Sequence, residues 1–298
     1  MAVEQKRLQN TFILEDGRKL VYDIYGAMEG IPYVYFHGYP SSRLEARSIH
    51  EKAEEKNIKL IAIDRPGIGL SDFQQNRTIV DWSSDISELS KELNLEKFGV
   101  VSFSAGAPYA LACGLKIPEK LNKIVIVSAL GGVDFKQLGL INYHKFVFGI
   151  AGSLPLIYRF LFWWRRVRLV RGKNAAKKYY RSNLKYLTTK DQEVLQDATI
   201  LDAVVEYQCE ACRKGCKGLT HEAKMLGKSW GMNLEDISSN LKINLWHGVE
   251  DLIAPVTASK EIEGMLPKSI ANYKEDEGHF SLMFNHHEEI LEELQKSN

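Results

Sequence analysis

The chain is poor in the residues that mark most specialised protein classes. It has four cysteines and eight prolines among 298 residues, too few for a disulfide-stapled protein or a proline-rich disordered one. Its first ten residues contain no apolar run of the secretory type, so we expect no secretion signal. The sequence therefore predicts a globular protein of the reducing cytoplasm.

An excess of either charge is also missing. Lys and Arg number 39, Asp and Glu number 38, and the net charge is +1. The chain as a whole lacks the basic character of a nucleic-acid-binding protein, so no nucleic-acid partner is expected. The balance hides a local difference, because residues 135–235 contain 18 basic and 8 acidic side chains whereas the remainder contains 21 and 30. A compositional shift of this size marks a candidate subdomain.

Short β-rich runs alternate with segments of helical periodicity. Strands are predicted at residues 11–15, 19–25, 32–37, 59–64, 98–104, 124–129, 243–247 and 271–274. Helices are predicted at residues 41–56, 80–93, 105–115, 258–265 and 280–294. Such alternation is typical of a parallel sheet covered by helices on both faces. The predicted fold class is α/β, with a mostly parallel, doubly wound sheet of eight strands.

The alternation stops after Gly132 and resumes at residue 243. We therefore expect residues 1–134 and 236–298 to form the core, and residues 135–235 to form a helical cap inserted after the sixth strand.

One segment of the predicted cap approaches the length of a membrane span. Residues 146–164 contain a single charge, Arg159, over nineteen positions. Glycines and Pro155 interrupt the run, so we expect it to line an apolar ligand pocket as the inner face of a lid rather than to contact a membrane. A basic stretch follows, and we interpret it as a solvated outer face, with attraction of an anionic substrate or of anionic lipid headgroups as the alternative: Arg165, Arg166, Arg168, Arg171, Lys173, Lys177, Lys178 and Arg181.

A serine stands where a predicted strand meets a helix of small residues. The motif SFSAG at 102–106 differs from the G-x-S-x-G nucleophile elbow only at its first position, which is Ser102. On such a sharp turn the hydroxyl of Ser104 would project above the sheet edge. An earlier strand ends in HGYP at 37–40, so an amide of that loop and the amide of Ala105 are candidates for an oxyanion hole.

The motifs HGYP, DRPGIGLSD, SFSAGAPYALA, WHGVEDLIAP and EGHFSL follow one another in this order. In this the chain resembles the α/β-hydrolase family over nearly its whole length. The resemblance implies that Ser104 is the nucleophile, that His279 is the general base and acid, and that Asp251 orients the imidazole. Asp134, which follows the strand predicted at 124–129, is the alternative acid.

The resemblance also implies the oxyanion donors, namely the backbone amides of Tyr39 and Ala105, with Gly38 as the alternative. His37 is interpreted as a support for its own loop, and His247 as a structural residue of the strand that precedes the acid.

No cofactor and no metal site are expected. Residues 67–69, Gly-Ile-Gly, lack the third glycine of a dinucleotide fingerprint and do not open a predicted helix. Cys209, Cys212 and Cys216 have the spacing i, i+3, i+7, which we interpret as one helical face in the core of the cap. No fourth metal ligand is evident beside them.

The sequence thus predicts a cofactor-free serine hydrolase that cleaves an ester or related acyl bond of a small, partly apolar substrate. A serine at the elbow argues against dehalogenase and epoxide-hydrolase relatives, which use aspartate there. The alternative hypothesis is a ligand-binding or signalling module that keeps the fold with little turnover.

Overall fold

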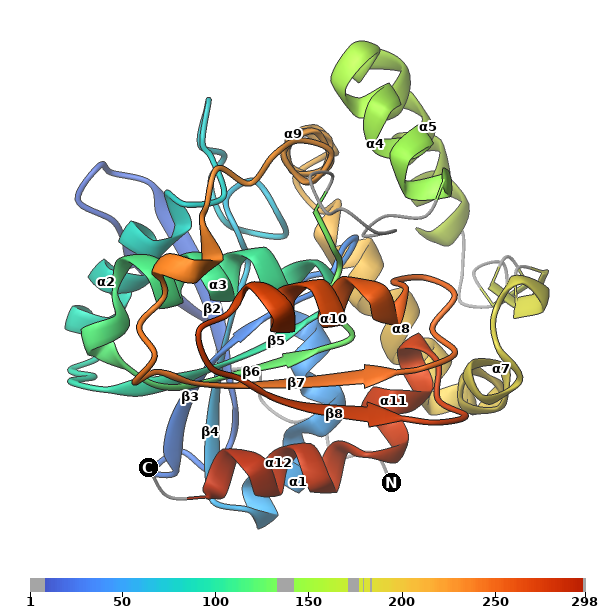
Figure 1. Ribbon diagram of the computed structural model, residues 1–298. Coiled ribbons are helices and arrows are strands. Elements are labelled where there is room, and N and C mark those ends of the chain that lie inside the picture. Colours follow the sequence, from blue (N-terminus) through green and yellow to red (C-terminus); the bar gives the residue numbers. More distant parts are fainter. Residues whose placement is uncertain (1–8, 133–141, 171–176, 179, 183, 297–298) are drawn as a thin grey trace.

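The computed structural model describes residues 9–132, 142–170, 177–178, 180–182 and 184–296. Its centre is an eight-stranded sheet in the order β1-β2-β4-β3-β5-β6-β7-β8 (Figure 1). The strands are β1 (Gln9–Ile13), β2 (Lys19–Gly26), β3 (Ile31–Phe36), β4 (Ile58–Ile63), β5 (Phe98–Phe103), β6 (Leu121–Val127), β7 (Lys242–Gly248) and β8 (Ile270–Lys274). Every predicted strand is present within a few residues of its expected bounds, so the predicted fold class is confirmed.

Strand direction follows from the connections. A tight turn, in which Gly17 has a φ of +84°, joins β1 to β2, and the two strands pair antiparallel. β2 also pairs antiparallel with β4, whereas all remaining neighbours are parallel. Parallel neighbours require crossover connections, which here contain helices. The carboxyl ends of β3 to β8 therefore meet at one edge of the sheet.

Helices cover both faces of the sheet. One face packs against α2 (Trp82–Glu92), α3 (Ala107–Lys116) and α10 (Val256–Met265). The other packs against the 3₁₀ helix η1 (Arg43–Ile49), α1 (His50–Glu55), α11 (His279–Asn285) and α12 (His287–Gln295). In β5, Val100 belongs to the first apolar cluster and Val101 to the second, because successive side chains of a strand point to opposite faces.

Two of the predicted helices are divided. The expectation of one helix over 41–56 is wrong in its first half, which is the 3₁₀ helix η1. The helix expected over 280–294 begins at His279 and is interrupted at His286, which leaves helical geometry at φ −114° and ψ 16°. The ring of His286 contacts carboxylate oxygens of Glu277 and Glu289 at 3.2 and 2.5 Å, and these contacts hold the bend between α11 and α12.

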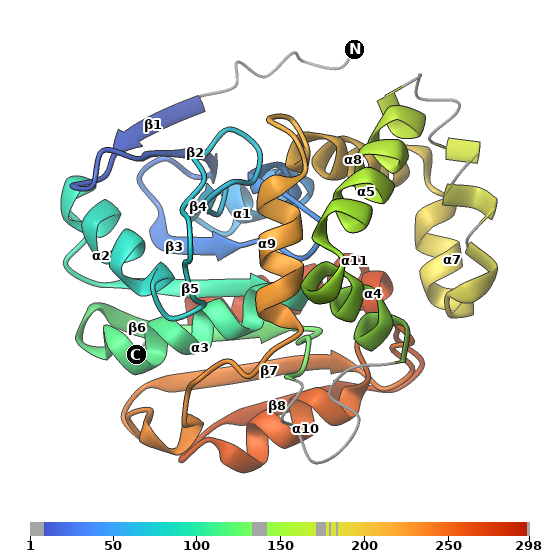
Figure 2. The same ribbon diagram turned by 90° about the horizontal axis from the view of Figure 1, so that it is seen from above.

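The segment between β6 and β7 is helical, as predicted. It contains α4 (Asn142–Ser153), α5 (Pro155–Val170), the 3₁₀ helix η4 (Leu184–Tyr186), α7 (Thr189–Gln196), α8 (Ala198–Ala211), α9 (Lys217–Leu226) and the short η5 (Leu234–Asp236). Figure 2 shows α4, α5, α7 and α8 on the side toward which the arrowheads of β5, β6 and β7 point. The exact boundaries of a separate cap at 135 and 235 stay a prediction, and residue 135 lies outside the described residues.

The apolar run 146–164 is divided between α4 and α5. Pro155 is the first residue of α5, a position that tolerates proline because the first helical N–H groups have no intrahelical partner. Phe148, Ala151 and Tyr158 are buried, whereas Phe146 is 67% exposed, so only part of the run faces the interior, and its role in lining a ligand pocket stays a prediction. Within the described residues, no helix is long and apolar enough to cross a membrane.

Candidate active site

Ser104 lies in the turn between β5 and α3. Its φ is +53°, a left-handed conformation that L-residues rarely adopt and that the strand-to-helix elbow imposes on its serine. A Cβ at Gly106 would lie 2.3 Å from the carbonyl oxygen of Phe36 and 3.1 Å from the Cβ of Ser102. Glycine is therefore required at position 106, whereas the small, fully buried Ser102 fits where the usual motif has its first glycine.

His279 and Asp251 come together from the ends of neighbouring parts of the sheet. Asp251 lies in the loop between β7 and α10, and His279 is the first residue of α11. Nδ1 of His279 is 2.6 Å from Oδ2 of Asp251. The other oxygen of Asp251 accepts hydrogen bonds from the amides of Ile253 and Ala254, at 2.8 Å each. The carboxylate is thus fixed in position, and it selects the tautomer in which Nε2 of the imidazole is unprotonated.

The electrostatics of this pair favour its charged form. Burial alone would raise the pKa of Asp251, but the charge of His279 and hydrogen bonds from His247 and His279 bring that pKa below its ordinary value. Burial alone would lower the pKa of His279, but Asp251, and then Asp191 and Glu45, raise it above its ordinary value. An imidazolium formed at His279 is therefore stabilised by the surrounding carboxylates.

The serine turn, the histidine and the HGYP loop are neighbours. The ring centroid of Phe103, which precedes Ser104, lies 4.9 Å from that of His279. A Cβ at Gly38 would lie 3.4 Å from the Cβ of Ser104. The structure therefore brings the predicted nucleophile, base, acid and glycine loop to the same edge of the sheet.

The HGYP loop is held by a buried guanidinium. Arg65 donates to the carbonyl oxygen of His37 at 2.6 Å and to that of Gly38 at 2.9 Å. The amide of Gly38 donates to Oε1 of Glu45 at 2.9 Å. A trans peptide directs its carbonyl and its amide to opposite sides. With the Gly38 carbonyl fixed toward Arg65, the Tyr39 amide is directed away from it, whereas the Gly38 amide is already engaged.

A carboxylate that the sequence analysis did not identify holds the start of α11. Asp191, in α7, is fully buried and accepts from the amides of His279, Phe280 and Ser281 at 3.0, 2.8 and 2.8 Å. A Cβ at Gly278 would lie 2.4 Å from Oδ2 of Asp191, so glycine is required there. The glycine before His279 was visible in the sequence, but its partner 88 residues away was not.

A further histidine, His144, lies in none of the motifs described above. It lies on α4 with its ring stacked on Phe148 at a centroid distance of 5.5 Å. Burial, and then the charge of His279, lower its pKa to about 4, so His144 is neutral at pH 7 and lies within electrostatic range of His279. His247, by contrast, is occupied structurally, with contacts to Ser259 Oγ at 2.6 Å and Ala254 O at 2.7 Å.

The three clustered cysteines do not share a helix, so that expectation is wrong. α8 ends at Ala211 and α9 begins at Lys217, because Gly215, with φ +106°, turns the chain between them. Cys212 and Cys216 are buried, with their sulfur atoms 3.6 Å apart. Among the described residues, no group of His, Cys, Asp or Glu could hold a metal ion.

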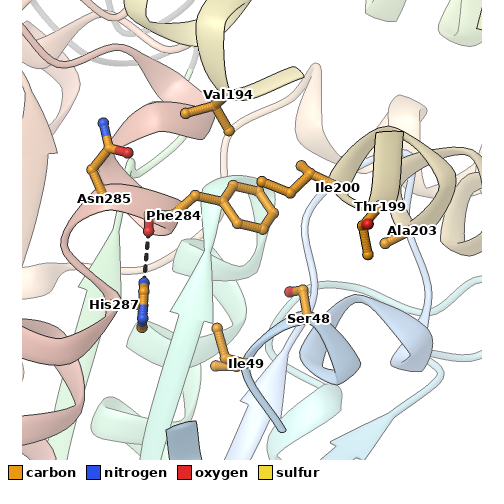
Figure 3. A pocket seen from close by; sticks show the side chains of 9 residues that line it. All are labelled: Ser48, Ile49, Val194, Thr199, Ile200, Ala203, Phe284, Asn285 and His287. Carbon is orange, nitrogen blue, oxygen red and sulfur yellow. Dashed lines mark hydrogen bonds between the residues drawn. The ribbon is translucent and has the colours of Figure 1, made fainter. Parts of the chain in front are cut away.

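Two further candidate positions lie apart from these residues or outside the described chain. Asp134, the alternative acid, lies outside the described residues. A cleft of about 300 Å³ opens between η1, α7, α8 and the α11–α12 bend, with Phe284 and Ile200 facing each other across it (Figure 3). None of Ser104, Asp251 and His279 lines this cleft, so it is separate from the candidate active site.

Comparison with known proteins places the chain in a family. Residues 32–286 match the family model described as alpha/beta hydrolase fold. The chain therefore belongs to the α/β-hydrolase fold family, in agreement with its strand order and with the motifs in its sequence.

Individual relatives are distant and carry different activities in their names. A non-heme chloroperoxidase from Streptomyces lividans is 28% identical over 129 residues, which are 43% of this chain and 47% of that protein. The matched stretch thus spans about half the length of that relative. An esterase from Rhodococcus sp. ECU1013 superposes with a TM-score of 0.70 at 18% identity, over 97% of this chain and 99% of its own. A bromoperoxidase from Bacillus anthracis superposes with a TM-score of 0.69 at 18% identity, over 97% and 98%.

Proposed function

We propose that the protein is a cofactor-free serine hydrolase that cleaves ester or related acyl bonds through Ser104, His279 and Asp251. The observation that carries the proposal is the 2.6 Å contact between His279 and Asp251 beside a serine at φ +53°. A serine hydroxyl needs a positioned base to become a nucleophile, and an imidazole oriented by a buried carboxylate is such a base.

In the proposed reaction, Oγ of Ser104 attacks the acyl carbon while its proton passes to Nε2 of His279. The tetrahedral intermediate collapses, and His279 returns the proton to the departing alcohol, which leaves an acyl-serine. Water then attacks the acyl-serine and gives its proton to His279, and the acid is released with Ser104 restored. Asp251 stays ionised and stabilises the imidazolium in both steps.

We assign the oxyanion donors to the backbone amides of Tyr39 and Ala105. The alternative donor, Gly38, is disfavoured because its amide already donates to Glu45. The amide of Tyr39 belongs to the peptide whose carbonyl Arg65 holds, so its direction is set before substrate arrives. Preorganised donors of this kind supply a large part of the transition-state stabilisation in acyl transfer.

Hydrogen peroxide is a second candidate acceptor for the acyl group, besides water. The relatives named chloroperoxidase and bromoperoxidase share this fold. On the proposed acyl-serine, hydrogen peroxide can replace water as the nucleophile and release a peracid. This needs no residue beyond those already assigned, so both reactions depend on Ser104.

The proposal is tested by labelling with a fluorophosphonate together with turnover of short p-nitrophenyl esters. Ser104→Ala should abolish labelling and lower turnover by about 10⁶-fold, the usual cost of losing a triad nucleophile. Ser102→Ala is the matched control, because Ser102 is equally buried and its hydroxyl has no hydrogen-bond partner among the described residues. Labelling of Ser104 without ester turnover would favour a ligand-binding module, and retention of activity in Ser104→Ala would overturn the assignment.

A further inference from the structure

The outer face of α5 is apolar and exposed. Leu156, Phe160, Trp163 and Trp164 are 74, 58, 48 and 44% exposed. Their spacing of i, i+4, i+7 and i+8 places them on one side of the helix. Tyr158, on the other side, is buried and packs on other apolar residues of the chain. The helix therefore has two apolar faces, of which the described residues cover one.

The exposed residues form a continuous aromatic surface. The ring of Phe160 lies 5.9 Å from Trp163 and 6.4 Å from Trp164, and the two tryptophan rings lie 6.5 Å apart. Of the fourteen large apolar side chains that are exposed among the described residues, eight fall within residues 146–164. Such a concentration marks an interaction surface, because isolated exposed apolar residues are ordinary but contiguous ones are not.

The charge around this surface specifies the partner. Residues 142–170, which form α4 and α5, contain five Lys and Arg and no Asp or Glu. Lys145 and Arg159, on the two helices themselves, are exposed. The partner should therefore be anionic. A second copy of this chain fits poorly, because a symmetric contact would bring two basic surfaces together.

The lengths of α4 and α5 suit binding to the surface of a membrane and not a membrane span. α4 and α5 have 12 and 16 residues and are separated at Leu154, and no described helix is long and apolar enough to cross a membrane. Figure 1 shows this pair, which we call the α4–α5 arm, at the margin of the molecule, away from the strands. Helices with Trp, Phe and Leu on one face and Lys or Arg beside them lie in the headgroup region of membranes.

We propose that the α4–α5 arm binds the surface of anionic phospholipid bilayers, with Phe160, Trp163 and Trp164 inserted at the level of the headgroups. The apolar rings supply the insertion, and the exposed Lys145 and Arg159 of the arm supply attraction to anionic lipid. The inference concerns binding alone and stands or falls independently of the proposed hydrolase reaction.

The test is co-sedimentation of the whole protein with two kinds of vesicle, phosphatidylcholine alone and phosphatidylcholine mixed with phosphatidylglycerol. We expect binding to the mixed vesicles, weakened by added salt because surface attraction is screened over about 10 Å at 0.1 M. The double variant Phe160→Ser/Trp163→Ser should bind at least about tenfold more weakly. Arg159→Glu should also weaken binding to the mixed vesicles.

Matched control variants distinguish binding by this surface from non-specific binding by other exposed residues. Ile13→Ser/Ile270→Ser removes two apolar side chains that are 58 and 60% exposed on the strands, and Lys91→Glu reverses an exposed charge on α2; both variants should bind like the parent. Because all the replaced residues are exposed, each variant should keep its circular dichroism spectrum.

The proposal is overturned by no binding to the mixed vesicles, by equal binding to both vesicle types, or by equal losses in test and control variants. It is also overturned if light scattering without lipid finds a dimer that Phe160→Ser/Trp163→Ser dissociates, because the surface would then serve self-association.

Discussion

The two halves of the insertion between β6 and β7 are attached to the rest of the protein in different ways. The second half, α7 to α9, uses buried carboxylates: Asp191 holds α11, Glu210 pairs with Arg43 at 2.7 Å, and Glu222 pairs with Arg65. The α4–α5 arm has no acidic residue and packs through rings, as in the Tyr39–Phe148 contact at 5.9 Å. A buried ion pair requires one particular partner and so fixes the position of its helix. An apolar surface is stabilised by any apolar partner that covers it. The carboxylates therefore place α7 to α9 around the site, and the arm is left with a face for another partner.

The largest effect that bears on this comparison is expected at Asp251, the proposed catalytic acid between β7 and α10. Asp251→Asn should lower kcat by about 10⁴-fold, because the amide favours the wrong imidazole tautomer. The measurement is ester hydrolysis by the purified variant, with circular dichroism to verify folding. Should Asp134→Asn cause that loss instead, the acid would lie after β6 and not after β7, and the assignment of Asp251 would fail.

The next effect tests the ion pair between α9 and the core. Glu222→Ala would leave Arg65 and Arg77 buried near no carboxylate of α9, so the free energy of unfolding should fall by about 3–5 kcal/mol. Urea denaturation measures it. Glu193→Ala, on the exposed side of α7, should change stability by no more than about 0.5 kcal/mol. Equal changes in the free energy of unfolding in the two variants would show that the buried carboxylate stabilises the protein no more than the exposed one.

Asp191→Asn tests whether α7 acts on the chemistry through charge as well as through contacts. In the proposed reaction the neutral form of His279 is the base, so kcat/KM should rise with pH through the pKa of His279, which lies above its ordinary value of 6.5. Removing the charge of Asp191, which contributes to that elevation, should move the rise to lower pH. Stability should also fall by about 1–3 kcal/mol, since three amides lose part of their acceptor.

Asp197→Asn is the control for that variant. Asp197 is six residues away and caps α8 by accepting from the amides of Thr199 and Ile200, and asparagine caps a helix as well as aspartate does. The pH profile of this control should not move. An unchanged profile in Asp191→Asn as well would reduce Asp191 to a purely structural residue.

The smallest effect is expected on the arm. Phe160→Ser/Trp163→Ser should change the free energy of unfolding by no more than about 1 kcal/mol per site, because about half of each side chain stays exposed in the folded chain. Urea denaturation without lipid is the measurement. A loss of several kcal/mol would mean that the two rings belong to the folded core, and the contrast between the two halves would disappear.

The sequence predicted the parts of the molecule that depend on local patterns. Alternation of short apolar runs predicted all eight strands, and the order of the motifs predicted that Ser104, Asp251 and His279 would lie at one edge. Asp191 could not be found in this way, because its partners are 88 to 90 residues distant and no periodicity links them. The orientation of α5 was also hidden, since a helix that is apolar on two faces does not reveal which one is covered. The cysteine spacing misled because it was compatible with a helix that Gly215 interrupts.

The hydrogen bonds from Arg65 to the carbonyls of His37 and Gly38 determine when the entropic cost of ordering this loop arises. A loop that must rearrange around each substrate loses rotational freedom at every turnover. Here the orientation of the proposed oxyanion donor, the Tyr39 amide, is set once, when the protein folds, by a guanidinium that is fully buried. Loss of these Arg65 hydrogen bonds would leave the affinity for an unreacted ester nearly unchanged but would lower the affinity for the tetrahedral adduct. A change at Arg65 should therefore lower the affinity for mimics of the adduct, such as boronic acids, far more than the affinity for substrates.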